Sequence, residues 1–336
     1  MLRLLAAAAL ALVPAACGNT AQDKITIICG ADEQWCVMMA SRFAEQTGID
    51  ADFARLSSGD ALDRIRRTRS APEYDVWHGG PADAYAAAAR EGMLEPYRSP
   101  MAAHARQGWG DPSGAWTGVY GGVLAFCNNV RKLTAKGLGP LLSWQELLDP
   151  RLAGSVGIAH PATSGTAYTA LWTQVELGGS AEAGLDYLRR LHPNVLRYNR
   201  SGAAAAEQAA RGQVAVGVAF SHDCVDLQEQ GFRDLQVSFP AEGSGYEVGG
   251  VAVLAGTRHP EAARRFVDWA LSGDSQRLGP LAGFYALPAS TEVAPDSKAA
   301  DLAQVRLIGY DFTRAGAAKS ELTRRFGAEI APPPER

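Results

Sequence analysis

Short motifs that identify common enzyme classes are missing from this sequence. It has no GxSxG elbow, no GxxxxGKS/T phosphate loop, no HExxH and no GxGxxG after a predicted strand. It has no CxxC pair, which disfavours a zinc or thiol-redox site. Its ten tyrosines include no adjacent pair. We therefore predict a protein that is not an enzyme and that has neither a cofactor nor a metal site.

An excess of positive charge is also missing. The 336 residues include 32 Lys and Arg against 36 Asp and Glu, a net charge of -4, and no basic cluster stands out. Nucleic acid is therefore not an expected partner, since binding to its phosphates needs clustered basic side chains. The length suffices for two domains with separate cores, and the 47% hydrophobic content is typical of globular proteins.

The apolar run near the N-terminus is too short to span a membrane. Arg3 precedes about ten apolar residues, Leu4–Val13, and small residues follow up to Cys17. This order predicts a signal peptide over residues 1–16. The small residues directly before Cys17 favour lipidation of that cysteine, although Pro14 departs from the usual aliphatic residue. Ordinary signal cleavage is the alternative.

The five cysteines are an odd number, which is unusual in an oxidising compartment. If Cys17 is lipidated, four remain, Cys29, Cys36, Cys127 and Cys224, and these allow three pairings. We favour Cys29–Cys36, which would join a strand end to the first helix, with Cys127–Cys224 as the second bridge.

Strand, small-residue turn and helix alternate along most of the chain, which is typical of a parallel sheet covered by helices. Strands interrupted by glycine near Gly121 and Gly249 predict the crossovers between two α/β halves. We expect one lobe from residues 24–121 with 249–330, a second from residues 122–248, and a disordered tail over residues 331–336.

The boundaries of these elements follow from the apolar periodicity and the turn residues. The expected strands cover residues 24–29, 49–56, 74–77, 118–129, 194–198, 213–221 and 245–254. The expected helices cover residues 31–48, 61–69, 83–92, 167–177, 181–191, 203–212, 261–271 and 301–329.

Four turns between a strand and a helix carry small and hydroxyl residues. They are Ser57-Ser58-Gly59, His78-Gly79-Gly80, Thr163-Ser164-Gly165-Thr166 and Ser201-Gly202. The first turn of a helix has unpaired N–H groups at the positive end of its dipole, so each turn could hold an anion. Ligands of open α/β sheets bind beyond the carboxyl ends of strands, so these turns are expected to meet in the cleft between the halves. The alternative is that they only cap helices.

Other side chains are also expected to face the cleft. His222 and Asp223 end a predicted strand and could bind hydroxyl, amine or phosphate groups. Glu247 comes just before the second crossover strand. Trp77 follows a strand end and could stack on a sugar, with His78 beside it reaching an anion. A surface or core position is the alternative for each of them.

Five segments of the chain resemble a known family. They are CGADEQWC, DVWHGGPAD, SWQELLDPRLAGSVGIAHPATSGTAYTAL, SGAAAAEQAARGQVAVGVAFSHD and HPEAARRFVDWALSGDSQ. They are similar to segments of extracellular solute-binding proteins of ABC importers, in the group historically labelled ferric-iron-binding. The resemblance covers roughly residues 24–330. It implies an α/β fold of the two-lobed type II periplasmic binding protein class, with a ligand cleft between the lobes.

Within that group, the SGTAYT and HD motifs resemble those of hexose-phosphate-binding and 2-aminoethylphosphonate-binding members, whereas ferric binders use an adjacent tyrosine pair. The resemblance thus implies a periplasmic monomer that delivers a small anionic organic solute to a permease and its ATPase, and lipidation of Cys17 would anchor this protein to the membrane. Ferric iron or a polyamine is the alternative ligand, and a phosphoester hydrolase is the alternative class of protein. The implied phosphate contacts are Ser58, Ser164, Gly165, Thr166 and Ser201, and the implied contacts to the organic part are His222, Asp223 and Glu247.

Overall fold

The computed structural model describes residues 24–335. The signal peptide predicted over residues 1–16 and the lipidation predicted at Cys17 lie outside this range. None of the helices within the described range combines the length and the hydropathy that a membrane span needs.

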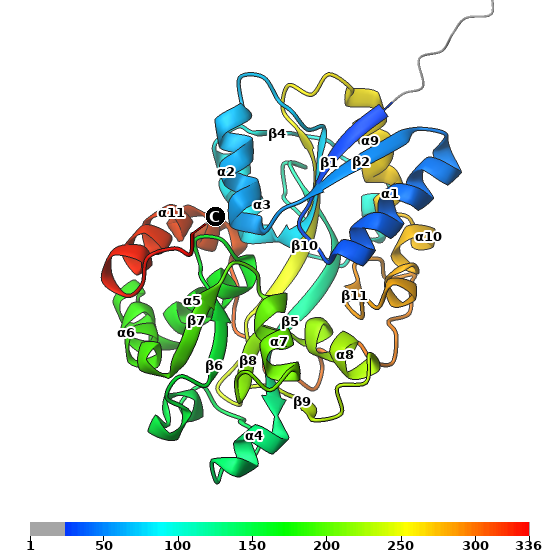
Figure 1. Cartoon of the computed structure of the whole chain (residues 1–336). Helices are drawn as coiled ribbons and strands as arrows, with labels where there is room; N and C mark the ends of the chain where they lie inside the picture. Colours follow the sequence, from blue (N-terminus) through cyan, green and yellow to red (C-terminus); the bar gives the residue numbers. More distant parts are fainter. Residues whose placement is uncertain (1–23, 336) are drawn as a thin grey trace, which may run out of the picture.

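Two helix-covered sheet regions make up the chain (Figure 1). We call the region built on β1, β2, β3 and β10 the first lobe, and the region built on β6, β7 and β8 the second lobe. The path of hydrogen-bonded neighbours runs β2 (Asp50–Arg55), β1 (Lys24–Cys29), β3 (Val76–Pro81), β10 (Tyr246–Leu254), β5 (Thr117–Asn129), β8 (Val216–Phe220), β6 (Val156–Ala159) and β7 (Val195–Asn199). Shorter strands at its sides are β4 (Leu94–Glu95), β9 (Leu235–Ser238) and β11 (Leu287–Pro288).

The long strand β5 passes from one lobe into the other. From Thr117 to Val123 it pairs antiparallel with β10. From Leu124 to Asn128 it pairs antiparallel with β8. Within each lobe, parallel pairs (β1 with β2 and β3, β6 with β7 and β8) leave the carboxyl ends of the strands pointing to the same edge.

Each lobe has its own helices and apolar core. Local signals set the helix ends: in the first helix, the Asp32 carboxylate accepts from the N–H groups of Gln34 and Trp35, and Gly48 ends the helix with φ 74°. The first lobe carries α1 (Glu33–Thr47), α2 (Ser58–Thr68), α3 (Ala82–Arg90), α9 (Pro260–Ala270) and α10 (Gly273–Gln276). The second lobe carries α4 (Val130–Ala135), α5 (Gly165–Gly178), α6 (Ala181–Leu191), α7 (Ala203–Ala210) and α8 (Ser221–Glu229).

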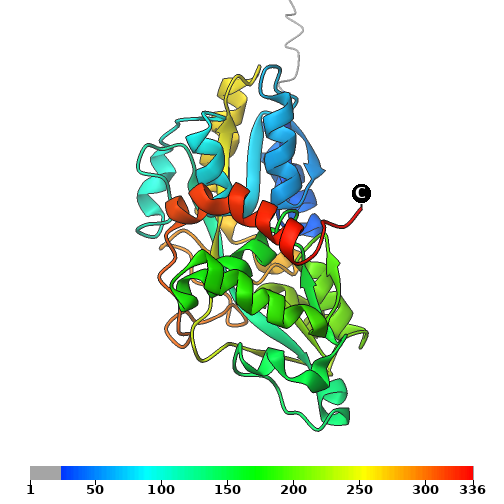
Figure 2. The same cartoon turned by 90° about the vertical axis from the view of Figure 1, so that its left-hand side faces the viewer.

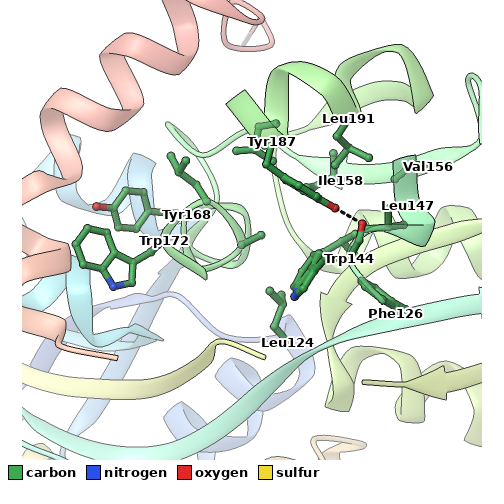
Figure 3. Packing of buried hydrophobic residues seen from close by; sticks show 14 of the residues in the cluster. Leu124, Phe126, Trp144, Leu147, Val156, Ile158, Tyr168, Trp172, Tyr187 and Leu191 are labelled. Atoms are coloured by element: carbon green, nitrogen blue, oxygen red, sulfur yellow. Dashed lines mark hydrogen bonds between the residues drawn. The ribbon is translucent and has the colours of Figure 1, made fainter. Parts of the chain in front are cut away.

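The core of the second lobe packs aromatic rings between β5, β6 and the helices α5 and α6 (Figure 3). Trp144 packs edge-on against Phe126 with ring centroids 5.0 Å apart. The Tyr187 hydroxyl donates to the Trp144 carbonyl oxygen at 2.6 Å, so the buried phenol has a partner. These contacts join α6 to β5 through the loop that carries Trp144.

The last helix, α11 (Phe312–Glu329), lies across the boundary between the lobes (Figure 2). Its Gly316 lies against α3, since a Cβ added there would come within 2.7 Å of the Asp83 carbonyl oxygen. Its Phe326 belongs to the core of the second lobe. The helix does not begin at residue 301, as predicted, because Asp311 caps it and accepts from the Arg314 N–H at 3.0 Å.

Residues 331–335, part of the tail for which disorder is predicted over residues 331–336, contact the second lobe. The Ala331 carbonyl oxygen lies 2.9 Å from Nε2 of His160. The Arg200 guanidinium donates to the Pro334 carbonyl oxygen at 3.1 Å. These contacts fix a proline-rich stretch that composition alone marks as disordered.

Both favoured disulfides are present. Cys29–Cys36 joins β1 to α1, and Cys127–Cys224 joins β5 to α8. The second bridge ties α8, the helix that begins at Ser221, to the strand shared by the lobes.

Candidate functional site

A cleft between the lobes lies where the N-termini of five helices meet. The residues at or just before the starts of α1, α2, α5, α7 and α8 all line it. These helices follow β1, β2, β6, β7 and β8, so the carboxyl ends of five strands also point into the cleft. Such helix ends present unpaired N–H groups and the positive end of the helix dipole.

One end of the cleft is rich in hydroxyl groups, and we call its residues the anion seat. Ser164 caps α5, with its Oγ accepting from the Ala167 N–H at 3.3 Å. Ser201 Oγ accepts from the Ala204 N–H at 3.4 Å before α7. These bonds fix the hydroxyl groups and leave their O–H donors free for a ligand. The seat consists of Ser58, Ser164, Gly165, Thr166 and Ser201.

The anion seat draws on both lobes. A Cβ added to Gly165 of α5 would lie 2.9 Å from Oγ of Ser58 in α2. A Cβ added to Gly202 would lie 2.2 Å from Oγ1 of Thr166. Glycine thus allows a close approach of three backbones around one small volume. Arg55, at the end of β2, is the only Lys or Arg among the described residues that line this cleft, and its Nε donates to the Ala31 carbonyl oxygen at 3.1 Å.

The other end of the cleft carries His222, Asp223 and Glu247. Nε2 of His222 lies 3.8 Å from an oxygen of each carboxyl group. Burial lowers the pKa of His222 to about 3, so the imidazole is neutral and neither contact is an ion pair at neutral pH. Burial and the nearby Asp32 raise the pKa of Asp223 to about 7. Burial and Asp223 raise the pKa of Glu247 well above its ordinary value.

Aromatic rings line this second end. The Phe284 ring lies 4.8 Å from the His222 ring and 4.8 Å from the Tyr120 ring, and both contacts are edge-on. Phe220 stacks on His222 with centroids 5.6 Å apart. Apolar faces beside carboxyl and imidazole groups suit a ligand with C–H surfaces and hydroxyl or amino donors.

A wider hollow of about 250 Å³ continues from this end toward solvent, and we call it the vestibule. It shares Asp32, His222 and Asp223 with the cleft. Glu207 and Asp226 also line it. The vestibule therefore brings further acidic side chains, together with Arg211, to the part of the cleft that holds His222 and Asp223.

Eight of the predicted site residues meet in the cleft. They are Ser58, Ser164, Gly165, Thr166, Ser201, His222, Asp223 and Glu247.

Four predicted site residues lie elsewhere. Trp77 is fully buried and stacks on Tyr85 at 4.0 Å. His78 is 1% exposed in the core of the first lobe, and Gly79 accepts from the Tyr85 hydroxyl at 3.0 Å. These three residues are inside β3, which runs on to Pro81 instead of ending at Trp77. Gly59 contacts the second lobe directly rather than the cleft.

Several cleft residues are not predicted from the sequence. Arg55 lies at the end of a strand, just before Ser57. The rule that predicted the seat residues, which looks for polar side chains between a strand and a helix, could therefore have identified Arg55 as well. Asp32 caps α1, a role that does not by itself point to a ligand. Tyr120 lies in the middle of β5 and Phe284 lies in a C-terminal loop, and neither has a local pattern that points to a ligand.

Known proteins share both the sequence pattern and this fold. A family model described as bacterial extracellular solute-binding protein matches residues 38–306. An uncharacterized protein of Haemophilus influenzae is 37% identical over 303 residues, covering 88% of this chain and 87% of the relative. The structure of the periplasmic binding protein AfuA from Actinobacillus pleuropneumoniae, with exogenous fructose-6-phosphate bound, superposes with a TM-score of 0.89. It is 35% identical, with 92% of this chain and 99% of that chain covered. Iron-bound HitA from Pseudomonas aeruginosa shares the fold, with a TM-score of 0.78 and 21% identity over 91% of this chain and 99% of its own.

Proposed function

The chain belongs to the family of bacterial extracellular solute-binding proteins, and from this premise we propose that its cleft captures a small organic phosphate or phosphonate. Proteins of this family are the periplasmic binding components of ABC importers, and they deliver their solute to a permease and its ATPase. They have the two-lobed type II fold, as this chain has. We propose the same class of partner here, with the protein acting as a monomer.

The anion seat is the observation that carries this proposal. Hydroxyl groups and helix N-termini from both lobes face one small volume, with the Arg55 side chain also lining the cleft. A tetrahedral phosphate accepts several hydrogen bonds at once, and helix N-termini are frequent phosphate sites. A phosphate at the seat would bridge Ser58 of the first lobe to Ser164 and Ser201 of the second.

The organic part of the solute is proposed to contact His222, Asp223 and Glu247. The Asp223 carboxylate accepts hydrogen bonds, and the Glu247 carboxyl group, whose raised pKa favours the protonated form, can both donate and accept. This end therefore favours a ligand with hydroxyl groups, such as a hexose. AfuA, whose structure holds fructose-6-phosphate, is the relative that favours a hexose phosphate. 2-Aminoethylphosphonate is the second candidate, with its ammonium group next to Asp223.

Capture follows from the two-lobed geometry. A ligand that contacts both lobes binds the closed arrangement better than an open one, and this difference in affinity drives closure. The chemistry of the site opposes the two alternative ligands. A polyamine would place its charge against helix N-termini and Arg55, and ferric iron would lack the adjacent tyrosines on which the related ferric binders depend.

A thermal-shift and calorimetry panel tests the proposal. Glucose 6-phosphate, 2-aminoethylphosphonate, inorganic phosphate, ferric citrate and spermidine are compared on the mature protein. A ligand at about a hundred times its Kd stabilises the folded state by roughly 2.7 kcal/mol, which is several degrees in the midpoint. A shift with an organic phosphate or phosphonate is expected, whereas a shift only with iron or spermidine would contradict the proposal.

Ser164→Ala and Ser180→Ala form a matched pair for this panel. Both serines cap a helix, and Ser180 Oγ accepts from the Ala183 N–H at 3.1 Å in the second lobe, away from the cleft. Each variant loses about 1 kcal/mol of folding stability with its cap. Only Ser164→Ala is expected to lose affinity for the phosphate. Release of inorganic phosphate from glucose 6-phosphate, lost in Asp223→Ala, would instead indicate a hydrolase.

A further inference from the structure

One ion pair joins the two lobes directly beside the anion seat. The Arg200 guanidinium, just after β7 in the second lobe, contacts both carboxylate oxygens of Asp60 in α2 of the first lobe, at 2.6 and 2.8 Å. The two side chains are 35% and 30% exposed, so solvent only partly screens the pair. Both charged residues lie within two positions of a residue that is proposed to bind the phosphate.

Each partner is tied to a loop of the seat. Asp60 lies two residues after Ser58, and its Oδ2 accepts from the Ser57 hydroxyl at 2.7 Å. Arg200 immediately precedes Ser201, and its carbonyl oxygen accepts from the Thr163 hydroxyl at 3.0 Å. The pair therefore connects the loops that begin α2, α5 and α7.

A backbone hydrogen bond closes the same junction. The Gly59 N–H donates to the Thr163 carbonyl oxygen at 2.9 Å, across the lobe boundary. A Cβ at Gly59 would lie 2.0 Å from the Ala162 carbonyl oxygen, so only glycine allows the two backbones to come this close. This bond and the Arg200–Asp60 pair must break together when the lobes separate.

The C-terminal segment holds Arg200 in position. A second nitrogen of its guanidinium donates to the carbonyl oxygens of Pro334 and Glu335 at 3.1 and 3.4 Å. His160 anchors the same segment: its Nδ1 accepts from the Ala162 N–H at 3.1 Å, so Nε2 carries the proton that it donates to Ala331. The C-terminal segment and Asp60 thus bind different nitrogens of the same guanidinium.

From these contacts we propose that Asp60 and Arg200 are positioning residues for solute capture: they latch the lobes and align the seat hydroxyls without touching the ligand. The proposal rests on the proposed function, because the latch acts on the phosphate seat. The latch stabilises only the closed state, because its two residues lie in different lobes. The apparent Kd of a ligand that binds the closed state rises as the population of that state falls.

Four single variants test the latch. Asp60→Asn and Arg200→Gln remove the pair, and Asp63→Asn and Arg197→Gln are controls on the same helix and the same strand. Within residues 24–335, the ion pair of Asp63 is with Arg66, at 3.5 Å, and Arg197 has no ion pair. Each latch variant is expected to raise the Kd for glucose 6-phosphate about fivefold, the upper range for a partly exposed pair. The double variant Asp60→Asn/Arg200→Gln should lose no more than either single one, and Arg200→Lys should recover part of the affinity.

Amide exchange at Gly59 in the protein without added solute provides a second readout that does not depend on the ligand. It should be about fivefold faster in Asp60→Asn and Arg200→Gln than in wild type, and unchanged in the controls. Equal exchange in all variants would overturn the latch, and so would faster exchange with an unaltered Kd. If wild type does not bind glucose 6-phosphate, the proposed ligand is wrong, and the exchange at Gly59 still decides whether the latch exists.

Discussion

Nε2 of His222 lies 3.8 Å from Oε1 of Glu247, and the two side chains are 6% and 3% exposed. His222 comes from α8 in the second lobe, and Glu247 comes from β10. Gly122 of β5 pairs with Glu247 in the sheet. The strands shared between the lobes therefore form the floor on which the imidazole and the carboxyl group meet.

Gly122→Ala tests this floor. The added Cβ would lie 2.6 Å from Cε1 of His222 and 3.1 Å from Oε1 of Glu247, so both side chains must move. We expect a loss of about 1–3 kcal/mol in folding stability from overpacking, and about tenfold weaker binding of glucose 6-phosphate. Gly139→Ala is the control, since a Cβ there meets nothing within 4 Å. Wild-type affinity in Gly122→Ala would show that the His222–Glu247 arrangement does not contribute to binding.

Asp223 is expected to make solute binding dependent on pH. Its pKa of about 7 in the free protein falls when ligand hydroxyl groups donate to the carboxylate, so binding releases a proton. Affinity for glucose 6-phosphate should thus fall as the pH drops below about 7, by at most about tenfold per pH unit from this group. Asp223→Asn should lose this part of the pH dependence and keep the part due to the phosphate, whose second pKa is about 6.

Asp223→Asn should also stabilise the free protein while it weakens binding. Because the folded-state pKa is raised above 3.8, ionised Asp223 costs folding stability from about pH 4 upward, in full above about pH 7. We expect a higher thermal midpoint without ligand at pH 8, together with about tenfold to hundredfold weaker binding, typical of a lost bond to a charged group. A lower midpoint would contradict a ligand-binding role for this buried carboxylate.

His78 is expected to make the first lobe sensitive to acid. Burial lowers its pKa from 6.5 to about 4, and neither ring nitrogen has a hydrogen-bond partner among residues 24–335. Protonation of His78 in the unfolded chain therefore lowers the free energy of unfolding as the pH falls from 6.5 toward 4. The total loss is about 3 kcal/mol, and no loss occurs above pH 6.5. Urea unfolding of His78→Leu should show a smaller loss between pH 7.5 and 4.5 than wild type. The exposed His259→Gln should match wild type, and identical pH profiles for His78→Leu would refute the assignment.

His78 also shows where prediction from the sequence ends. Strand–turn–helix order places Ser58, Ser164 and Ser201 correctly in the cleft, because the carboxyl ends of parallel strands share one edge whatever their contacts. The same rule misplaces His78 and Gly79. The glycines suggest a turn, but the Gly80 N–H donates to the Tyr120 hydroxyl at 2.9 Å, and this distant contact keeps the segment in β3.

Contacts between distant segments also explain the residues that the sequence does not reveal. Phe284 is part of the cleft only because the C-terminal loop returns to β5, where the ring meets Tyr120. Arg200 precedes a predicted turn, but its partner Asp60 is 140 residues away. The helix cap of Asp311 competes with a helical pattern that starts earlier, and only the observed hydrogen bond decides between them. Local sequence patterns thus predict the strands, most helices and the hydroxyl-rich turns. The other cleft residues and the start of α11 depend on contacts that a local pattern does not reveal.

The two disulfides are expected to differ in their contribution to stability. The Cys127–Cys224 bridge closes a loop with a sequence separation of 97, and Cys29–Cys36 one of 7. Loop-closure entropy then predicts about 4–5 kcal/mol for the first and about 2–3 kcal/mol for the second. Urea unfolding of Cys127→Ala/Cys224→Ala and Cys29→Ala/Cys36→Ala measures the difference. Equal losses would show that residual structure or local strain outweighs chain entropy.

A buried ion pair joins α3 to α11. Lys319 Nζ lies 2.8 Å from Oδ1 of Asp83, and their side chains are 5% and 0% exposed. The Tyr310 hydroxyl donates to Oδ2 at 3.1 Å, and the ammonium group lies 3.6 Å from the centre of the Tyr168 ring. The tyrosines thus help to stabilise both buried charges, but the main partner of each charged group is the other one.

Lys319→Met should therefore destabilise the protein by about 3–5 kcal/mol, because it leaves the Asp83 carboxylate buried without a cation. The double variant Asp83→Asn/Lys319→Met removes both charges and should cost less than Lys319→Met alone. Arg131→Gln, which breaks the exposed pair with Asp234, should change stability by less than about 1 kcal/mol. Urea denaturation of wild type, Asp83→Asn, Lys319→Met and the double variant gives the coupling energy directly. A double variant as unstable as the sum of its singles would show that the pair is not coupled, and that packing rather than charge holds α11 against α3.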